Sequence, residues 1–300
     1  MSDPMNMPGK RIHVFLCLTF AFSSVFYYLS AQGSHYGYSL YLMWCPGVAG
    51  VITQWMYYRT LRGMGWQWPK KQHLLLSYGL PLLYGMLVYG FVWLTGLGQF
   101  VPFERVQEMA GQLHVAVRSP MLLLVLYILG NATIGVVING VAALGEEIGW
   151  RGFLVPELSR KYSFTATAII SGVIWALWHS PVILFSDYNM KGVSIWYGLA
   201  CFTVMVVSSC FAYTWLRLKS GSLWTAVILH ASHNALIQAI FNPLTGNTGP
   251  TPYVIGEFGI GLALAMVVIA FLFWQRRSEL PGTRLIGKTI QQVSKVRETV

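Results

Sequence analysis

Charged residues are scarce in this chain of 300 residues. Only 10% of them are Asp, Glu, Lys or Arg, against about a quarter in ordinary soluble proteins, whereas 55% are hydrophobic. So few charges cannot cover the surface of a soluble globular domain of this size. The composition therefore excludes that class and indicates a polytopic membrane protein.

Aspartate and cysteine are also rare, and their scarcity excludes several kinds of site. The only aspartates are Asp3 and Asp187, so the two membrane aspartates of an aspartyl intramembrane protease are missing. No HExxH sequence occurs, which removes the commonest helical zinc-protease motif. The cysteines fall in apolar stretches without CxxC spacing, which speaks against a disulfide framework or a zinc knuckle. They are Cys17, Cys45, Cys201 and Cys210.

Long apolar stretches are what the sequence has in abundance. A hydrocarbon core of about 30 Å requires roughly 20 helical residues. We therefore expect an all-α protein of about eight transmembrane helices. The first is expected to be retained, because no small-x-small cleavage site follows it. The eight stretches are residues 12–31, 39–58, 74–96, 122–146, 166–186, 195–216, 222–240 and 254–274.

The basic residues predict the orientation in the membrane, because cytoplasmic loops carry the excess of Lys and Arg. With a cytoplasmic N-terminus, 17 of the 20 basic residues lie on the inside, and the exceptions are Arg105, Arg118 and Lys191. Both termini are therefore predicted to be cytoplasmic. The same residues lie beside anionic lipid headgroups and account for the net charge of +10, so no nucleic-acid partner is expected.

No segment before residue 275 could fold as a separate soluble domain. Residues 1–274 are expected to form one transmembrane domain, and residues 275–300, with six basic and two acidic side chains, a cytoplasmic tail. Residues 103–117 place apolar side chains on one helical face, which predicts a short interfacial helix.

Two adjacent carboxylates and an arginine occur at the predicted cytoplasmic end of the fourth span, as Glu146, Glu147 and Arg151. An ionised side chain placed deep in the bilayer costs about 2.5 to 3.5 kcal/mol, so a compensating partner is expected. Glu147 and Arg151 are four residues apart and can pair on one helical face. Glu146 points about 100° away and is left as a candidate general base facing a cavity. The alternative is an ion-paired helix end at the interface.

Two other spans carry polar residues at membrane depth. His179 lies in the fifth span, and His230 and Asn234 share one face of the seventh because they are four residues apart. Interhelical hydrogen bonding is the common role of a lone residue of this kind. Polar groups on three spans instead predict one shared pocket.

Two further polar residues are expected to be less important. Asn139 lies seven residues before Glu146 on nearly the same helical face and is expected to take part in packing. His233 points about 60° away from His230 and is therefore ranked below it.

The order and spacing of these residues resemble the CPBP family of CAAX-processing and bacteriocin-processing intramembrane endopeptidases, also called the Abi family. The three motifs are EExxxR at 146–151, an aromatic-xxxH element at 175–179 and HxxxN at 230–234. The resemblance covers about residues 140–240, and the expected family core spans about 120–240. One departure is Trp175, where the family usually has phenylalanine.

The resemblance implies a role for each motif residue. Glu146 would be the catalytic base, Glu147 would pair with Arg151, and the remaining motif residues, His179, His230 and Asn234, would complete the site. We expect Glu146, aided by His179, to deprotonate a water molecule that attacks a peptide carbonyl. His230 and Asn234 would then hold the oxyanion.

The expected function is that of an intramembrane protease, a multi-pass protein of the cell inner membrane. Its substrate would be a membrane-anchored peptide or protein, either a prenylated CAAX-type protein, cleaved after the lipidated cysteine, or a peptide related to bacteriocins. Besides this substrate, the lipid bilayer is the only partner expected.

The sequence leaves three alternatives open. Glu146, His179 and His230 form an acceptable zinc-ligand set, so the cofactor is undetermined between zinc, which would make the enzyme a metalloprotease, and none. Intramembrane carboxylates and histidines also relay protons in transporters, so a proton-coupled transporter is a second possibility. The third is a nonproteolytic immunity or scaffold protein in which these residues only pack.

Overall fold

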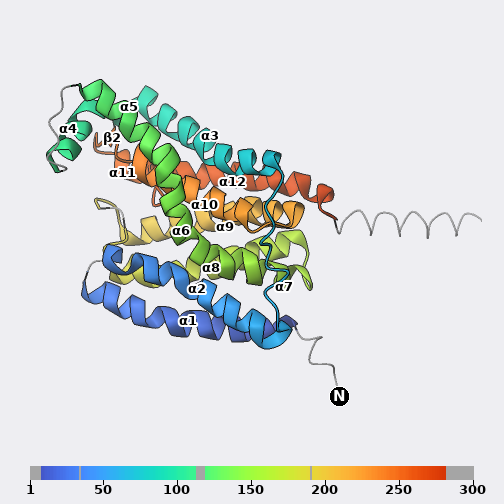
Figure 1. Ribbon diagram of the computed structural model, residues 1–300. Coiled ribbons are helices and arrows are strands. Elements are labelled where there is room, and N and C mark those ends of the chain that lie inside the picture. Colours follow the sequence, from blue (N-terminus) through green and yellow to red (C-terminus); the bar gives the residue numbers. More distant parts are fainter. Residues whose placement is uncertain (1–7, 34, 113–118, 190, 282–300) are drawn as a thin grey trace, which may run out of the picture.

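The computed structural model describes residues 8–33, 35–112, 119–189 and 191–281, and this part of the chain is almost entirely helical (Figure 1). The single sheet in these ranges joins two strands of two residues each, β1 (Gln99–Phe100) and β2 (Thr245–Gly246), which pair antiparallel. The all-α class is thus confirmed. The helices and helical turns, in chain order, are α1 (Pro8–Gln32), α2 (His35–Tyr58), α3 (Lys71–Thr95), α4 (Pro102–Gln112), α5 (Pro120–Gly130), η2 (Asn131–Gly135), α6 (Val136–Glu147), η3 (Ile148–Leu154), α7 (Val155–Ser159), α8 (Phe164–Phe185), α9 (Ile195–Ser220), α10 (Trp224–His233), η4 (Asn234–Phe241), α11 (Thr251–Val254), α12 (Ile260–Gln275) and η5 (Arg276–Glu279).

Six helices in the described ranges are long and apolar enough to cross a membrane, and the chain is a multi-pass membrane protein. They correspond to six of the eight expected spans. The other two expected spans are also helical, as α2 and as α10 continued by η4. The second of these is less apolar because it carries His230, His233, Asn234 and Gln238. The count of eight and the side of the membrane on which the termini lie stay predictions.

The fourth expected span is part of a much longer helix. Helical structure continues without interruption over Pro120–Ser159 and includes the π-helical turns η2 and η3. Glu146, Glu147 and Arg151 therefore lie within a continuous helix. Their place at the cytoplasmic end of the fourth span stays a prediction. The helix crosses the bundle obliquely (Figure 1), and Glu146 lines the same cavity as His179 of α8.

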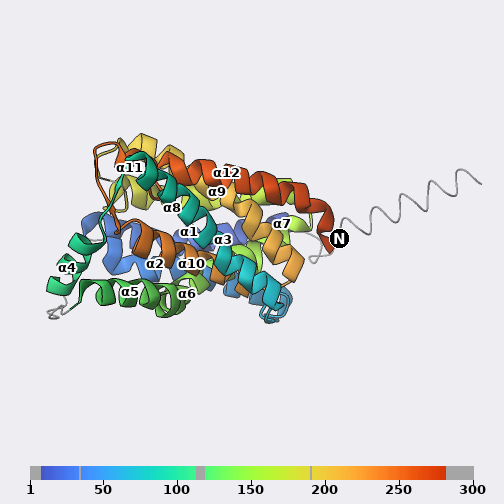
Figure 2. The ribbon, with the colours of Figure 1, turned by 90° about the horizontal axis from the view of Figure 1, so that it is seen from above.

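The two ends of the described chain lie at the same end of the bundle, where α1 begins and α12 finishes (Figures 1 and 2). At this end the Glu157 carboxylate of α7 forms ion pairs with Arg11 of α1 at 3.1 Å and with Arg160 at 3.1 Å. It also accepts a hydrogen bond from the Tyr58 hydroxyl at the end of α2 at 2.6 Å. This buried carboxylate ties three segments together. The division at residue 274 stays a prediction, and residues 282–300 of the expected tail lie outside the described residues.

A helix, α4, covers the expected range 103–117 as far as Gln112, and its place at the membrane interface stays a prediction. Residues 113–118 lie outside the described ranges. The four cysteines are free, as expected.

Glycines bring α2 into backbone contact with the helix that carries the two glutamates. A Cβ at Gly47 would lie 2.4 Å from the carbonyl oxygen of Gly145, and one at Gly149 would lie 2.4 Å from that of Pro46. Small residues four positions apart, such as Gly145 and Gly149, allow membrane helices to pack closely. Because Gly145 and Gly149 flank Glu146 and Glu147, this contact fixes the position of both carboxylates.

A pair of glycine substitutions on the long helix tests this packing. Gly149→Ala should lower stability by about 1 to 3 kcal/mol, because the new methyl group meets backbone that cannot move aside easily. Gly140→Ala is the matched control, because a Cβ there meets nothing within 4 Å. The midpoint of thermal unfolding in detergent should fall only for Gly149→Ala. Equal midpoints for both variants would contradict the close contact.

Candidate active site

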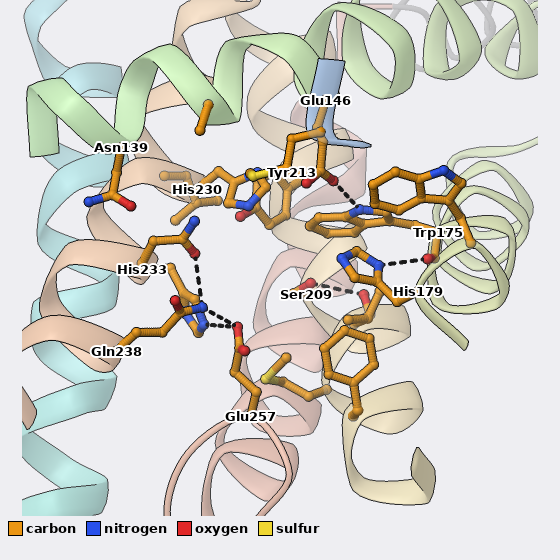
Figure 3. A pocket seen from close by; sticks show the side chains of 18 of the residues that line it. Asn139, Glu146, Trp175, His179, Ser209, Tyr213, His230, His233, Gln238 and Glu257 are labelled. Atoms are coloured by element: carbon orange, nitrogen blue, oxygen red, sulfur yellow. Dashed lines mark hydrogen bonds and ion pairs between the residues drawn. The ribbon is translucent and has the colours of Figure 1, made fainter. Parts of the chain in front are cut away.

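A cavity of about 250 Å³ lies inside the helical bundle (Figure 3). Its walls come from α2, α3, α6, α8, α9, α10 and η4, and from the turn before α12. Four of the six predicted site residues line it: Glu146, His179, His230 and Asn234. The other two, Glu147 and Arg151, lie outside its lining. The three sequence motifs therefore converge on one site, with four side chains at the cavity wall and two behind it.

Glu146 hangs from α6 into the cavity and is only 1% exposed. Its Oε2 accepts hydrogen bonds from the indole N–H groups of Trp175 at 2.7 Å and Trp150 at 3.3 Å. Both indole N–H groups only donate, so the Glu146 oxygen is the acceptor in both bonds. Trp175, which stands where the family usually has phenylalanine, thus provides a hydrogen bond that phenylalanine cannot.

Glu147 points away from the cavity, as the helical period predicts. Its carboxylate accepts from Nη1 of Arg151 at 3.0 and 3.1 Å, and its Oε1 also lies 3.0 Å from Nδ1 of His230. The expected pair of Glu147 with Arg151 is therefore present, and both residues are almost completely buried. The contact with His230 was not foreseen, because a helical pattern does not show which neighbouring helix a side chain reaches.

Aromatic rings and a thiol complete the surroundings of Arg151. Its guanidinium lies 4.3 Å from the ring centre of Trp175 and 4.1 Å from that of Tyr213, and its Nη2 donates to Sγ of Cys210 at 3.1 Å. Cation–π contacts of this kind are strongest when desolvated. Arg217 of α9 donates to the Arg151 carbonyl at 2.8 Å and so fixes the backbone there.

The local backbone around both motifs is π-helical. η3 begins directly after Glu147 and contains Arg151, and η4 begins at Asn234. Single π-helical turns widen a helix and recur at functional sites. Here η4 starts at a site residue, and η3 starts directly after one and contains another.

The hydrogen bonds of both motif histidines determine what they can present to the cavity. Nδ1 of His179 lies 3.0 Å from the carbonyl oxygen of Trp175, which can only accept. Nδ1 of His230 faces the Glu147 carboxylate, which also only accepts when ionised. In the neutral form each imidazole therefore carries its proton on Nδ1 and has a lone pair on Nε2.

A second polar cluster, which the sequence did not predict, lines the opposite wall of the cavity (Figure 3). Its centre is Glu257, in the turn before α12. Oε1 accepts from His233 at 3.0 Å and from Gln238 at 3.0 Å, and Oε2 accepts from the Tyr188 hydroxyl at 2.8 Å. Nδ1 of His233 lies 2.5 Å from the Tyr84 hydroxyl of α3. Glu257 is the only acidic residue in the stretch 254–274, and this isolated charge was the signal available in the sequence.

Asn139 also lines the cavity, but its amide donates to the Gly135 carbonyl of its own helix at 2.8 Å. His233, which was ranked below His230, also lines the cavity. It lies about one turn of α10 after His230.

The sequence leaves the cofactor open between zinc and none. In the described ranges no group of three or more His, Cys, Asp or Glu side chains is arranged to hold a metal ion. Glu146 already accepts from two indoles, and Nδ1 of both His179 and His230 is engaged with an acceptor. Each histidine keeps a lone pair on Nε2, so these bonds do not decide between zinc and no cofactor.

Known proteins are similar to this chain in the region that carries the three motifs. Residues 122–236 match the family model of the type II CAAX prenyl endopeptidases, Rce1-like. CAAX prenyl protease 2 from Methanococcus maripaludis is 38% identical over 93 residues, which make up 30% of this chain and 34% of that protein. The chain thus matches about a third of the length of this curated relative. All three motifs lie within the matched residues, and this stretch of the chain is similar to the type II CAAX prenyl endopeptidases.

Proposed function

We propose that the protein is an intramembrane endopeptidase that hydrolyses a peptide bond with a water molecule activated by Glu146. The observation that carries this proposal is the lining of one cavity by a buried carboxylate, two imidazoles and a carboxamide from three helices. These groups supply the base and the donors that peptide hydrolysis requires.

The first step is attack by water on the scissile carbonyl carbon. Glu146 takes one proton of the water, while Nε2 of neutral His179 accepts a hydrogen bond from the other and orients the molecule. The water oxygen bonds to the carbonyl carbon, and the carbonyl oxygen becomes an oxyanion. When the carbon–nitrogen bond breaks, protonated Glu146 returns its proton to the leaving amine.

Two donors stabilise the oxyanion. Asn234 offers its amide N–H, and His230 offers Nε2–H when its imidazole is protonated. The Glu147 carboxylate, 3.0 Å from Nδ1 of His230, stabilises that imidazolium. Glu147 and Arg151 therefore act on the reaction through His230, without contacting the substrate.

The substrate class follows from the surroundings of the site and from the family. The cavity lies among apolar helices and its lining includes Leu42, Met43, Val182, Phe202 and Met205. Apolar peptide side chains next to a membrane anchor fit such a lining. A prenylated CAAX-type protein is the substrate we favour, with a peptide related to bacteriocins as the second choice, and the cell inner membrane as the location.

Release of the three C-terminal residues from a farnesylated CAAX peptide in liposomes tests this function. Glu146→Ala should abolish release, and Asn234→Ala should lower kcat by about 10² to 10³, the usual effect of removing one oxyanion donor. Asn131→Ala is the matched control, because the Asn131 amide donates at 3.0 Å to Tyr127 of its own helix, outside the cavity. Its activity should equal that of the wild type. Full activity of Glu146→Ala would exclude the mechanism.

The same liposomes separate the two other candidate functions. A transporter would move protons or solute in response to a gradient without releasing peptide. A scaffold protein would do neither, and Glu146→Ala would leave its cellular phenotype unchanged.

Trp175→Phe tests the hydrogen bond that distinguishes this chain from the family's usual motif. Phenylalanine preserves an aromatic face for Arg151 but removes the 2.7 Å donor to Glu146. We expect kcat to fall about tenfold, the value of one charge-assisted hydrogen bond of about 1.4 kcal/mol, with little change in KM. An unchanged kcat would show that the indole N–H does not matter to the reaction.

A further inference from the structure

We infer that Glu257 is a positioning residue, which acts through Gln238 to turn the amide N–H of Asn234 into the cavity. This inference rests on the proposed function, in which Asn234 donates to the oxyanion. It concerns a residue that lies outside the stretch matched by the family, residues 122–236.

The Glu257 carboxylate restricts which groups can face it, because an ionised carboxylate only accepts hydrogen bonds. Its three neighbours, His233, Gln238 and Tyr188, lie between 2.8 and 3.0 Å from its oxygens, and all three can donate. Glu257 therefore requires Gln238 to present its NH₂ group.

Gln238 passes this restriction on to Asn234. Nε2 of Gln238 also lies 3.4 Å from Oδ1 of Asn234, one helical turn earlier. Because Gln238 must present its NH₂ group to Glu257, the same group also faces Asn234. Asn234 must therefore accept this hydrogen bond with its carbonyl oxygen. The NH₂ group of Asn234 is then left for the cavity, which this residue lines.

The direction of the Asn234 amide matters because the neighbouring imidazoles, in their neutral forms, do not donate a hydrogen bond into the cavity. His179 and His230 then present lone pairs at Nε2, so neither donates to an oxyanion without gaining a proton. Of the motif side chains that line the cavity, Asn234 is the neutral donor available to an oxyanion, because the indole N–H of Trp175 is engaged by Glu146. An inverted Asn234 amide would place a carbonyl oxygen against the developing negative charge and would repel it.

Glu257 also sets the proton position of His233. Nε2 of His233 must donate to the carboxylate, so in the neutral imidazole Nδ1 accepts from the Tyr84 hydroxyl, 2.5 Å away. One carboxylate thus fixes the direction of two chains of hydrogen bonds along the same wall.

Exchanging the carboxylate and the carboxamide tests the inference. In the double variant Glu257→Gln with Gln238→Glu, the two side chains can still bond to each other and the net charge is unchanged. The acceptor, however, now lies beside Asn234, which must turn its NH₂ group toward residue 238. We expect kcat to fall about 10² to 10³-fold, as for loss of an oxyanion donor, with KM and the thermal midpoint close to wild type.

Single substitutions at Gln238 provide the matched controls, because this side chain is exposed. Gln238→Lys keeps a group that only donates, and Gln238→Leu removes the bond and leaves Asn234 free to rotate. The inference predicts that kcat is highest for Gln238→Lys, lower for Gln238→Leu and lowest for the exchange variant. A purely structural role predicts that the exchange, which keeps the bond, is milder than Leu. If the exchange variant fails to fold, the order of Lys and Leu still decides.

A third comparison separates this inference from the proposed function. Adding Asn234→Ala to the exchange should lower kcat little further, because the donor is already lost. If Asn234→Ala is crippled alone but the exchange keeps wild-type kcat, the inference is wrong and the proposed function stands. If Asn234→Ala alone is fully active, its oxyanion role and this inference are both wrong.

Discussion

The Glu147 carboxylate binds an arginine on its own helix and a histidine on a neighbouring helix. Taking such a charge out of water is costly, and the cost is offset only when every partner is in place. Arg151 supplies the opposite charge and His230 fills the remaining hydrogen-bonding position. The orientation of Glu146 follows, because the two glutamates are adjacent on one helix and cannot both face inward to Arg151. The cavity therefore receives the one carboxylate that Arg151 does not neutralise.

The position of the helix that carries Glu146 and Glu147 must be fixed as well. Backbone contact through Gly145 and Gly149 fixes it against α2, and the Glu157 cluster fixes its far end against α1 and the end of α2. Besides Glu146, two further carboxylates beside the cavity accept hydrogen bonds, Glu147 and Glu257, and each determines which way its donors point. Glu147 and Glu257 thus serve mainly to orient the hydrogen-bond donors of the site, and less to stabilise the fold.

The sequence predicted the helical class, the positions of the spans and the residues that converge on the cavity, because hydropathy and the helical period are local properties. Local spacing also predicted the pair of Glu147 with Arg151. Spacing alone could not predict the contact between Glu147 and His230, since it depends on which helices are neighbours. The continuation of the fourth helix to Ser159 was missed because residues 147–159 are polar enough to resemble a loop, although the protein buries them. Glu257 was missed because its partners are far apart in the sequence and no short motif contains it.

A double-mutant cycle on kcat between Glu147 and His230 is the most direct test of the coupling between the buried ion pair and the cavity. If Glu147 contributes to catalysis by holding the His230 imidazolium, Glu147→Gln combined with His230→Gln should lose about as much kcat as His230→Gln alone, provided that each variant remains folded by its thermal midpoint. Losses that multiply would mean that the two residues act independently, and would contradict the central role of the Glu147 carboxylate.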